Sequence, residues 1–294
     1  MSVQVDDIYL GSERGIWFIA TRVTVVLLLM LTGLLGNGLV LIIYRRDKKQ
    51  SGAVYIIALA VIDLMCCIIL LPQVPISELS DDLDWRLKIY VDKGYYALSA
   101  LSYYCYLFTQ VAMALDQVVA VFRPFKHTRM RKKLNWWLMS VGSVIIVVQL
   151  AALIQPNERI WQASLAAFVV IMLVCFTTLI GAYTATALKL SAQGRAFRPQ
   201  IAAQDQPRVQ QQPPPQAPML GQKRAMHIQA LKIYTSILLL FVLTNLASIG
   251  IGLLELRYMT YVYYLNHTAN PLIYYCFVAK FRTSVKEYWR QLIR

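Results

Sequence analysis

A few polar residues lie inside long apolar runs of this 294-residue chain, and they are the ones that could do chemistry. Asp63 and Asn37 each interrupt such a run, while Asn266 and Asn270 lie four residues apart, on one face of a helix. Pro271 lacks a backbone N–H, so it leaves a carbonyl near Asn266 or the following residue unpaired. We expect these residues to form a buried polar cluster around the Asp63 carboxylate, able to hold a cation or a proton.

A simpler interpretation is that these side chains only hydrogen-bond helices to one another. We prefer the functional interpretation because an aspartate is much costlier to bury in a membrane than an asparagine. His267, next to Asn266, is interpreted differently, since a lone histidine is more often packed or hydrogen-bonded than a ligand or a proton relay.

The composition indicates that these residues are positioned by membrane helices. Hydrophobic residues make up 58% of the chain and charged residues 15%, and the mean hydropathy is +0.50. Soluble domains are about 45–50% apolar and about 25% charged. Runs long enough to cross a hydrocarbon core of about 30 Å lie near 17–43, 54–77, 94–122, 134–155, 162–188, 229–254 and 258–279. The predicted fold is an all-α membrane protein, a seven-transmembrane helix bundle that forms one domain over residues 1–294.

The charge pattern predicts the orientation of the bundle. The net charge is +14, and most Lys and Arg residues lie in alternate connectors and after the last span. Because basic connectors stay in the cytoplasm, we expect an extracellular N-terminus, a cytoplasmic C-terminus and a multi-pass protein of the plasma membrane. No nucleic-acid partner is expected, since orientation explains the basic blocks.

Two cytoplasmic segments differ from the spans. Residues 191–222 are rich in Gln and Pro, which predicts a disordered third cytoplasmic loop. Residues 280–294 have an apolar face flanked by basic residues, which predicts an amphipathic helix on the membrane surface and makes membrane lipids a partner.

Three motifs together resemble the rhodopsin-like (class A) G-protein-coupled receptors. They are Gly36-Asn37, the run Leu59-Ala60-Val61-Ile62-Asp63, and Asn270-Pro271-Leu272-Ile273-Tyr274. The resemblance extends from about residue 17 to 294 and identifies the chain as an atypical member of unknown subfamily. No organic cofactor is expected, and the only ion that the resemblance implies is sodium, held by Asp63, Asn266 and Asn270 with Asn37 bonding nearby.

The resemblance also implies a cytoplasmic face that activates a heterotrimeric G protein, with arrestin as a further partner. That face is predicted from Asp116, Gln117, Tyr183, Phe241, Pro271 and Tyr274. Tyr274 resembles the tyrosine that turns inward on activation, Tyr183 the one that meets it, and Phe241 an aromatic that repacks.

The chain departs from the family pattern at two of these sites. The family usually has Asp-Arg-Tyr at the base of span three, whereas this chain has Asp116-Gln117-Val118, which puts coupling in doubt. Tyr106 falls where a serine often helps to bind sodium, which weakens the inference of an ion site.

Subfamily markers limit the ligand. Tyr264 replaces the lysine that retinal needs, and Ser99 replaces the carboxylate that amines need, so neither ligand is expected. The outer halves of the spans offer mostly neutral donors and aromatic rings, which suit a peptide or a neutral small molecule. The predicted pocket residues are Gln73, Ser99, Tyr103, Ser248, Glu255, Tyr261 and Tyr264.

The predicted function is therefore a receptor that binds an extracellular ligand and signals through a heterotrimeric G protein. One alternative is a non-signalling binding, scavenger or partner-subunit protein of the same fold. A third is a transporter or proton pump that uses Asp63 and His267, although the internal repeats typical of transporters are not visible. An enzyme is not expected, because the sequence has no nucleophile–base pair, metal cluster or phosphate loop.

Overall fold

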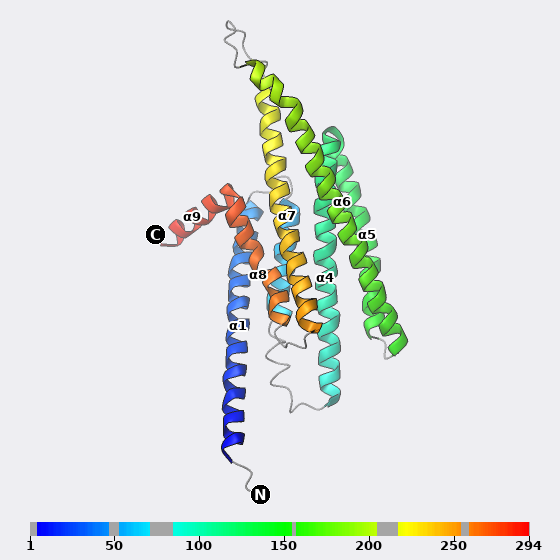
Figure 1. Cartoon of the computed structure of the whole chain (residues 1–294), viewed down its shortest axis with the longest axis vertical. Helices are drawn as coiled ribbons and strands as arrows, with labels where there is room; N and C mark the ends of the chain where they lie inside the picture. Colours follow the sequence, from blue (N-terminus) through cyan, green and yellow to red (C-terminus); the bar gives the residue numbers. More distant parts are fainter. Residues whose placement is uncertain are drawn as a thin grey trace. The chain divides into compact units, whose positions relative to one another are not determined.

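The computed structural model describes residues 5–46, 53–70, 85–154, 157–204, 217–253 and 259–293, and all of their regular elements are helices (Figure 1). The all-helical fold class is therefore confirmed. The elements are α1 (Val5–Arg46), α2 (Ala53–Met65), the π-helical turn η1 (Cys66–Leu70), α4 (Trp85–Phe122), the 3-10 turn η3 (Pro124–Lys126), α5 (His127–Ile154), α6 (Glu158–Gln204), α7 (Ala217–Leu253), α8 (Met259–Phe277) and α9 (Ala279–Ile293).

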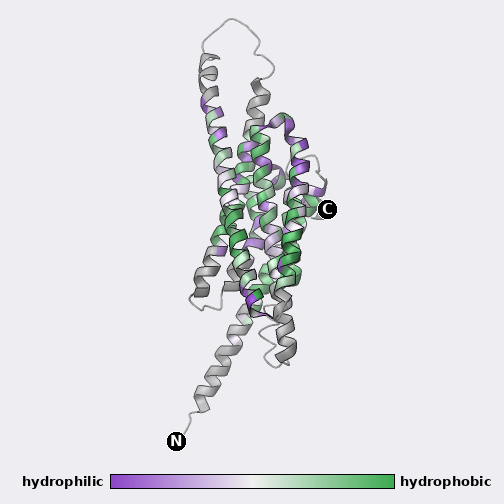
Figure 2. Cartoon of the chain, turned by 90° about the vertical axis from the view of Figure 1, so that its right-hand side faces the viewer, coloured by the Kyte–Doolittle hydropathy of each residue, from purple (hydrophilic) through white to green (hydrophobic). Residues whose placement is uncertain are grey.

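Within the described residues, five helical stretches are long and apolar enough to cross a membrane. They are Val23–Arg45, Ala97–Phe122, Pro124–Ala152, Gln162–Arg195 and Ala225–Asn245. Figure 2 shows hydrophobic residues along much of the coloured parts of the helices. Ala53–Ile69 is a shorter apolar helix, and α8 carries a group of polar residues in its middle. The membrane character is thus confirmed, while the count of seven spans stays a prediction.

Residues 191–222 were expected to be disordered, but part of this range is helical in the structure. Helix α6 continues to Gln204 and α7 begins at Ala217, so both ends of the range are helical. Good helix formers such as Ala, Leu and Gln allow each helix to continue past the apolar stretch. Residues 205–216 lie outside the described residues. The helix expected over 280–294 is present as α9.

The chain divides into two compact units, of which the first comprises residues 1–103 and 240–294. Here α1 packs against α2, η1, α8 and α9. The core contains Val26, Cys66, Cys67 and Tyr264. A Cβ at Gly33 would overlap the Cys67 thiol, and one at Gly36 would lie 2.8 Å from Cγ of Pro271. These two glycines therefore bring α1 close to its neighbours, as small residues do between membrane helices.

The second unit comprises residues 104–239. The hydroxyl of Ser164 on α6 donates a hydrogen bond to the side-chain oxygen of Gln149 on α5. The Tyr104 ring lies 5.4 Å from that of Phe168 in an edge-on arrangement, so aromatic packing joins α4 to α6. Gly142 of α5 faces the Phe108 ring of α4, where a Cβ would lie at 3.2 Å. These contacts link α4, α5 and α6 within the second unit.

Candidate functional site

The Asp63 carboxylate is the centre of a buried polar cluster in the first unit. Asp63 lies on α2 shortly before the helix widens into η1, and it has no exposed surface. The Nδ1 atom of His267 lies 2.8 Å from Oδ1, and Nδ2 of Asn270 donates to Oδ2 at 2.8 Å. Both partners come from α8, three residues apart, and therefore share one helix face. The carboxylate thus ties α2 to α8 through both of its oxygens.

Asn37 supplies a hydrogen-bond donor that Pro271 lacks in α8. A proline at position 271 has no N–H for the carbonyl of His267, four residues earlier in the helix. Nδ2 of Asn37, on α1, donates to that carbonyl at 2.9 Å and to the Gly33 carbonyl at 3.0 Å. The unpaired carbonyl expected from the sequence is therefore present, and α1 supplies its donor. Asn37 bonds to the α8 backbone rather than to Asp63.

His267 was expected to be packed or hydrogen-bonded and was not among the predicted ion-site residues, and the structure makes it a direct partner of Asp63. It is 1% exposed, its imidazole contacts Asp63, and its backbone carbonyl accepts from Asn37. One signal could have found it: His267 lies three residues before Asn270 and so shares its helix face. Asn266, which was predicted, is fully buried one residue earlier on α8.

Tyr274 lies in a group of three aromatic rings at the end of α8. Its ring centroid is 6.3 Å from that of Tyr44 on α1 and 6.2 Å from that of Phe281 on α9, edge-on in both cases. The rings of Tyr44 and Phe281 stack at 6.2 Å. This aromatic group joins three helices, so Tyr274 cannot turn without repacking α1 and α9.

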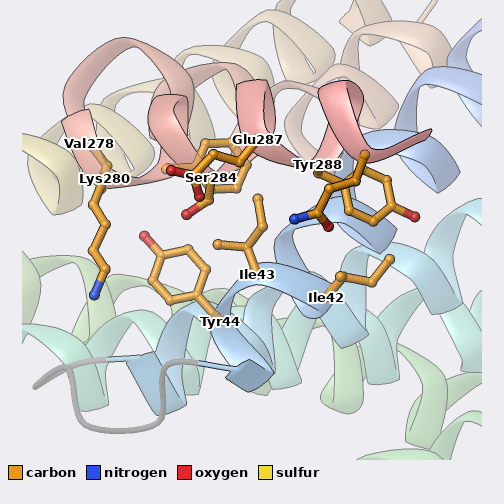
Figure 3. Close-up of a pocket in the computed structure, with 10 residues that line it drawn as sticks. Ile42, Ile43, Tyr44, Val278, Lys280, Ser284, Glu287 and Tyr288 are labelled. Carbon is orange, nitrogen blue, oxygen red and sulfur yellow. The ribbon is translucent and has the colours of Figure 1, made fainter. Parts of the chain in front are cut away.

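A cavity of about 290 Å³ adjoins this aromatic group between α1 and α9. Figure 3 shows Ile42, Ile43 and Tyr44 of α1 facing Ser284 and Tyr288 of α9 across it. Its walls carry both apolar side chains and polar ones. The cavity therefore lies against the amphipathic helix and apart from the Asp63 cluster.

At the base of α4, in the second unit, Asp116 pairs with a histidine. Nε2 of His127, at the start of α5, lies 2.8 Å from Oδ1 of Asp116, which is 1% exposed. Pro124 begins the turn η3, which reverses the chain and brings these two residues together. The guanidinium of Arg131, also on α5, adds positive charge near the same carboxylate.

Gln117, the next residue, is buried, and its amide oxygen has no hydrogen-bond partner within the described ranges. The aspartate of this motif is therefore paired even though the usual arginine is missing. The sequence did not indicate His127, because the pairing depends on the turn between α4 and α5.

The other predicted residues of the cytoplasmic face are buried. Phe241, on α7, is 1% exposed, and its ring centroid lies 5.3 Å from that of Tyr103 on α4. Tyr183, on α6, is buried in the second unit. Their roles in activation stay predictions.

Three of the predicted ligand-pocket residues have described side chains. Tyr264 packs in the core with Val26 and Cys67, Tyr103 packs on Phe241, and Ser99 is partly buried. The other four lie outside the described side chains: Gln73, Ser248, Glu255 and Tyr261. The ligand pocket therefore stays a prediction.

Comparison with known proteins gives one matching family. The model of the family described as "Serpentine type 7TM GPCR chemoreceptor Srx" matches residues 27–185, which is more than half of the chain. This range includes α2 with Asp63 and the base of α4 with Asp116.

Individual relatives are more distant. The C-C chemokine receptor type 7 of Mus musculus is 27% identical over 148 residues, covering 50% of this chain and 37% of the relative. The C-X-C chemokine receptor type 5 of Homo sapiens is 29% identical over 128 residues, covering 43% and 33%. The galanin-like G-protein coupled receptor npr-9 of Caenorhabditis elegans is 28% identical over 149 residues, covering 49% and 34%. The chain thus spans little more than a third of the length of the curated relatives it matches.

Proposed function

Because the chain belongs to the serpentine seven-transmembrane G-protein-coupled receptor family, within the rhodopsin-like class, we propose that it binds an extracellular ligand and activates a heterotrimeric G protein. It is a multi-pass membrane protein of signal transduction. In this proposal seven spans cross the plasma membrane, with the N-terminus outside and the C-terminus inside. The basic connectors of the sequence support this orientation.

The observation that carries the proposal is the polar cluster that joins α1, α2 and α8. Asn37, Asp63 and His267 connect these helices through buried hydrogen bonds. Such a cluster has few alternative partners, so a movement of α8 must exchange one set of bonds for another. A ligand that binds more tightly to one arrangement shifts the population toward it.

We propose a peptide as the first ligand class to test. The relatives are named as chemokine and galanin receptors, which supports ligands of that type. The segment 78–92 carries several acidic residues and lies on the predicted outer side, so its charge favours a cationic peptide. The neutral small molecule is the competing class.

The missing arginine favours one second candidate, a non-signalling binding protein. A neutral amide at Gln117 cannot form the charge-assisted bonds that an arginine forms. In the proposed receptor, the pair of Asp116 and His127 instead holds the base of α4, with the Asp116 carboxylate bonded from α5.

The test measures G-protein activation across the main classes in cells that express the full chain, without added ligand. Three forms are compared: wild type, Gln117→Arg and Asp63→Asn, with surface expression measured for each. Asp205→Asn removes the same charge from the cytoplasmic segment and serves as the matched control. Signalling that changes in Asp63→Asn but not in the control supports the receptor. Wild-type silence that ends in Gln117→Arg indicates that the fold is intact and coupling is lost at one residue.

If all forms reach the surface and neither the wild type nor Gln117→Arg activates any G protein, with or without a panel of cationic peptides, the non-signalling protein is the better description.

A further inference from the structure

The Asp63 carboxylate lies where the resemblance to rhodopsin-like receptors implies a sodium ion. A sodium ion there needs oxygen atoms around it, with at least one carboxylate oxygen open to it. In this chain Oδ1 is contacted by the His267 imidazole and Oδ2 accepts from the Asn270 amide, both at 2.8 Å. The two carboxylate oxygens are therefore each engaged by a nitrogen atom.

The Asn270 nitrogen also has the wrong polarity for a cation. A group that donates a hydrogen bond to a carboxylate points the positive end of its N–H dipole at the oxygen. Asn270 presents its NH₂ group to Asp63, not its carbonyl oxygen. A cation near Asp63 would meet the positive end of this dipole where it needs a ligand oxygen.

The position of His267 is fixed through both its backbone and its ring. Its backbone carbonyl is held by Asn37 from α1, and the Cys66 side chain interacts with the imidazole from η1. The residue is 1% exposed, and Asp63 has no exposed surface. The imidazole therefore has little room to swing away and admit an ion.

A buried carboxylate needs a partner of opposite charge or strong donors, because burying it alone is very costly. Among the described residues, His267 is the basic side chain that bonds to Asp63. It can therefore do for this carboxylate what a bound cation does in other receptors. The residues around Asp63 therefore fit His267 as the partner of the carboxylate better than they fit a sodium ion.

We propose that His267 is the permanent counter-ion of Asp63 and that this receptor binds no sodium ion at that site. The inactive arrangement of α2 and α8 is then stabilised from within the chain, at any sodium concentration. The inference does not depend on G-protein signalling, since a chain that never signals can still be tested for it.

The test is the melting temperature of the purified full chain in detergent, in NaCl or in choline chloride at equal ionic strength and constant pH. The expected result is that wild type melts at the same temperature in both salts. In His267→Ser a hydroxyl oxygen and free volume replace the ring, so sodium is expected to stabilise this variant. At ten times its dissociation constant, sodium would raise the melting temperature by about 3–6 °C. Adding Asp63→Asn to His267→Ser should remove the effect.

Two results would overturn the proposal. One is a sodium-dependent rise in the wild type that disappears in Asp63→Asn but not in Asp205→Asn, because sodium would then bind beside His267. The other is a folded His267→Ser variant that stays insensitive to sodium, because the ring would then not be what excludes the ion. If His267→Ser does not fold, His267→Asn offers a smaller side chain with an amide oxygen and is interpreted in the same way.

Discussion

The contact between Gly36 and the Pro271 ring allows a prediction with an internal control. A Cβ at Gly36 would lie 2.8 Å from Cγ and 3.0 Å from Cβ of Pro271, whereas carbon atoms normally pack at about 3.5–4.0 Å. The proline ring is rigid, so Gly36→Ala must push α1 away from α8 by roughly 0.7–1.2 Å. Overpacking of this kind costs about 1–3 kcal/mol.

Gly38 is the matched control, two residues further along the same helix. A Cβ there meets no atom within 4 Å. Gly38→Ala therefore only exchanges a poor helix former for a good one, which stabilises a helix by about 0.5–1 kcal/mol. Gly36→Ala has the same gain, so the difference between the two variants equals the overpacking cost alone, about 1–3 kcal/mol. For a chain of this size that corresponds to a melting temperature about 2–12 °C lower in Gly36→Ala.

The assay heats the purified variants with a thiol-reactive dye, which reports unfolding through the buried thiols of Cys66 and Cys67. Wild type is expected to lie between the two variants or close to Gly38→Ala. If Gly36→Ala melts within about 1 °C of Gly38→Ala, α1 does not approach Pro271 as described, and the packing argument fails.

Two more predictions concern hydrogen bonds. Asn37→Ala leaves the His267 carbonyl without a donor and is expected to destabilise the chain by about 1–3 kcal/mol in thermal unfolding. The same change should cost less in a Pro271→Ala background, where residue 271 regains its N–H. Equal costs in the two backgrounds would contradict the idea that Asn37 replaces the N–H that Pro271 lacks. His127→Ala removes the hydrogen-bond partner of the buried Asp116 side chain and is expected to cost about 1–3 kcal/mol. Asp116→Asn combined with His127→Ala should recover part of that loss in the same measurement.

Sequence reasoning reached the features that depend on local spacing. Hydropathy located the helices, because membrane burial requires long apolar runs. The four-residue spacing of Asn266 and Asn270 and the missing N–H of Pro271 predicted a polar face with an open carbonyl on α8. The structure contains that carbonyl and supplies its donor from Asn37.

Features that depend on pairing across the fold were not accessible in the same way. From the sequence, His267 could be either a packed histidine or a partner of Asp63. Only the distance between the two side chains in the structure distinguishes these two roles. The pairing of Asp116 with His127 spans eleven residues and a chain reversal at η3. The extent of α6 beyond the apolar run was missed because composition marks the loss of hydrophobicity, not the end of a helix.

The Gly36-Asn37 motif on α1 and the motif around Pro271 on α8 act together, and both bear on the position of His267. Gly36 leaves space for the Pro271 ring, and Asn37 replaces the N–H that the same proline removes. The carbonyl that Asn37 bonds belongs to His267, whose ring in turn bonds to Asp63 on α2. Any movement of α8 that displaces this residue must therefore disturb its bond to α1, its bond to α2, or both. A rearrangement that breaks both leaves the His267 carbonyl and Oδ1 of Asp63 without these partners in an apolar interior, so the arrangement described here is favoured until new partners are available.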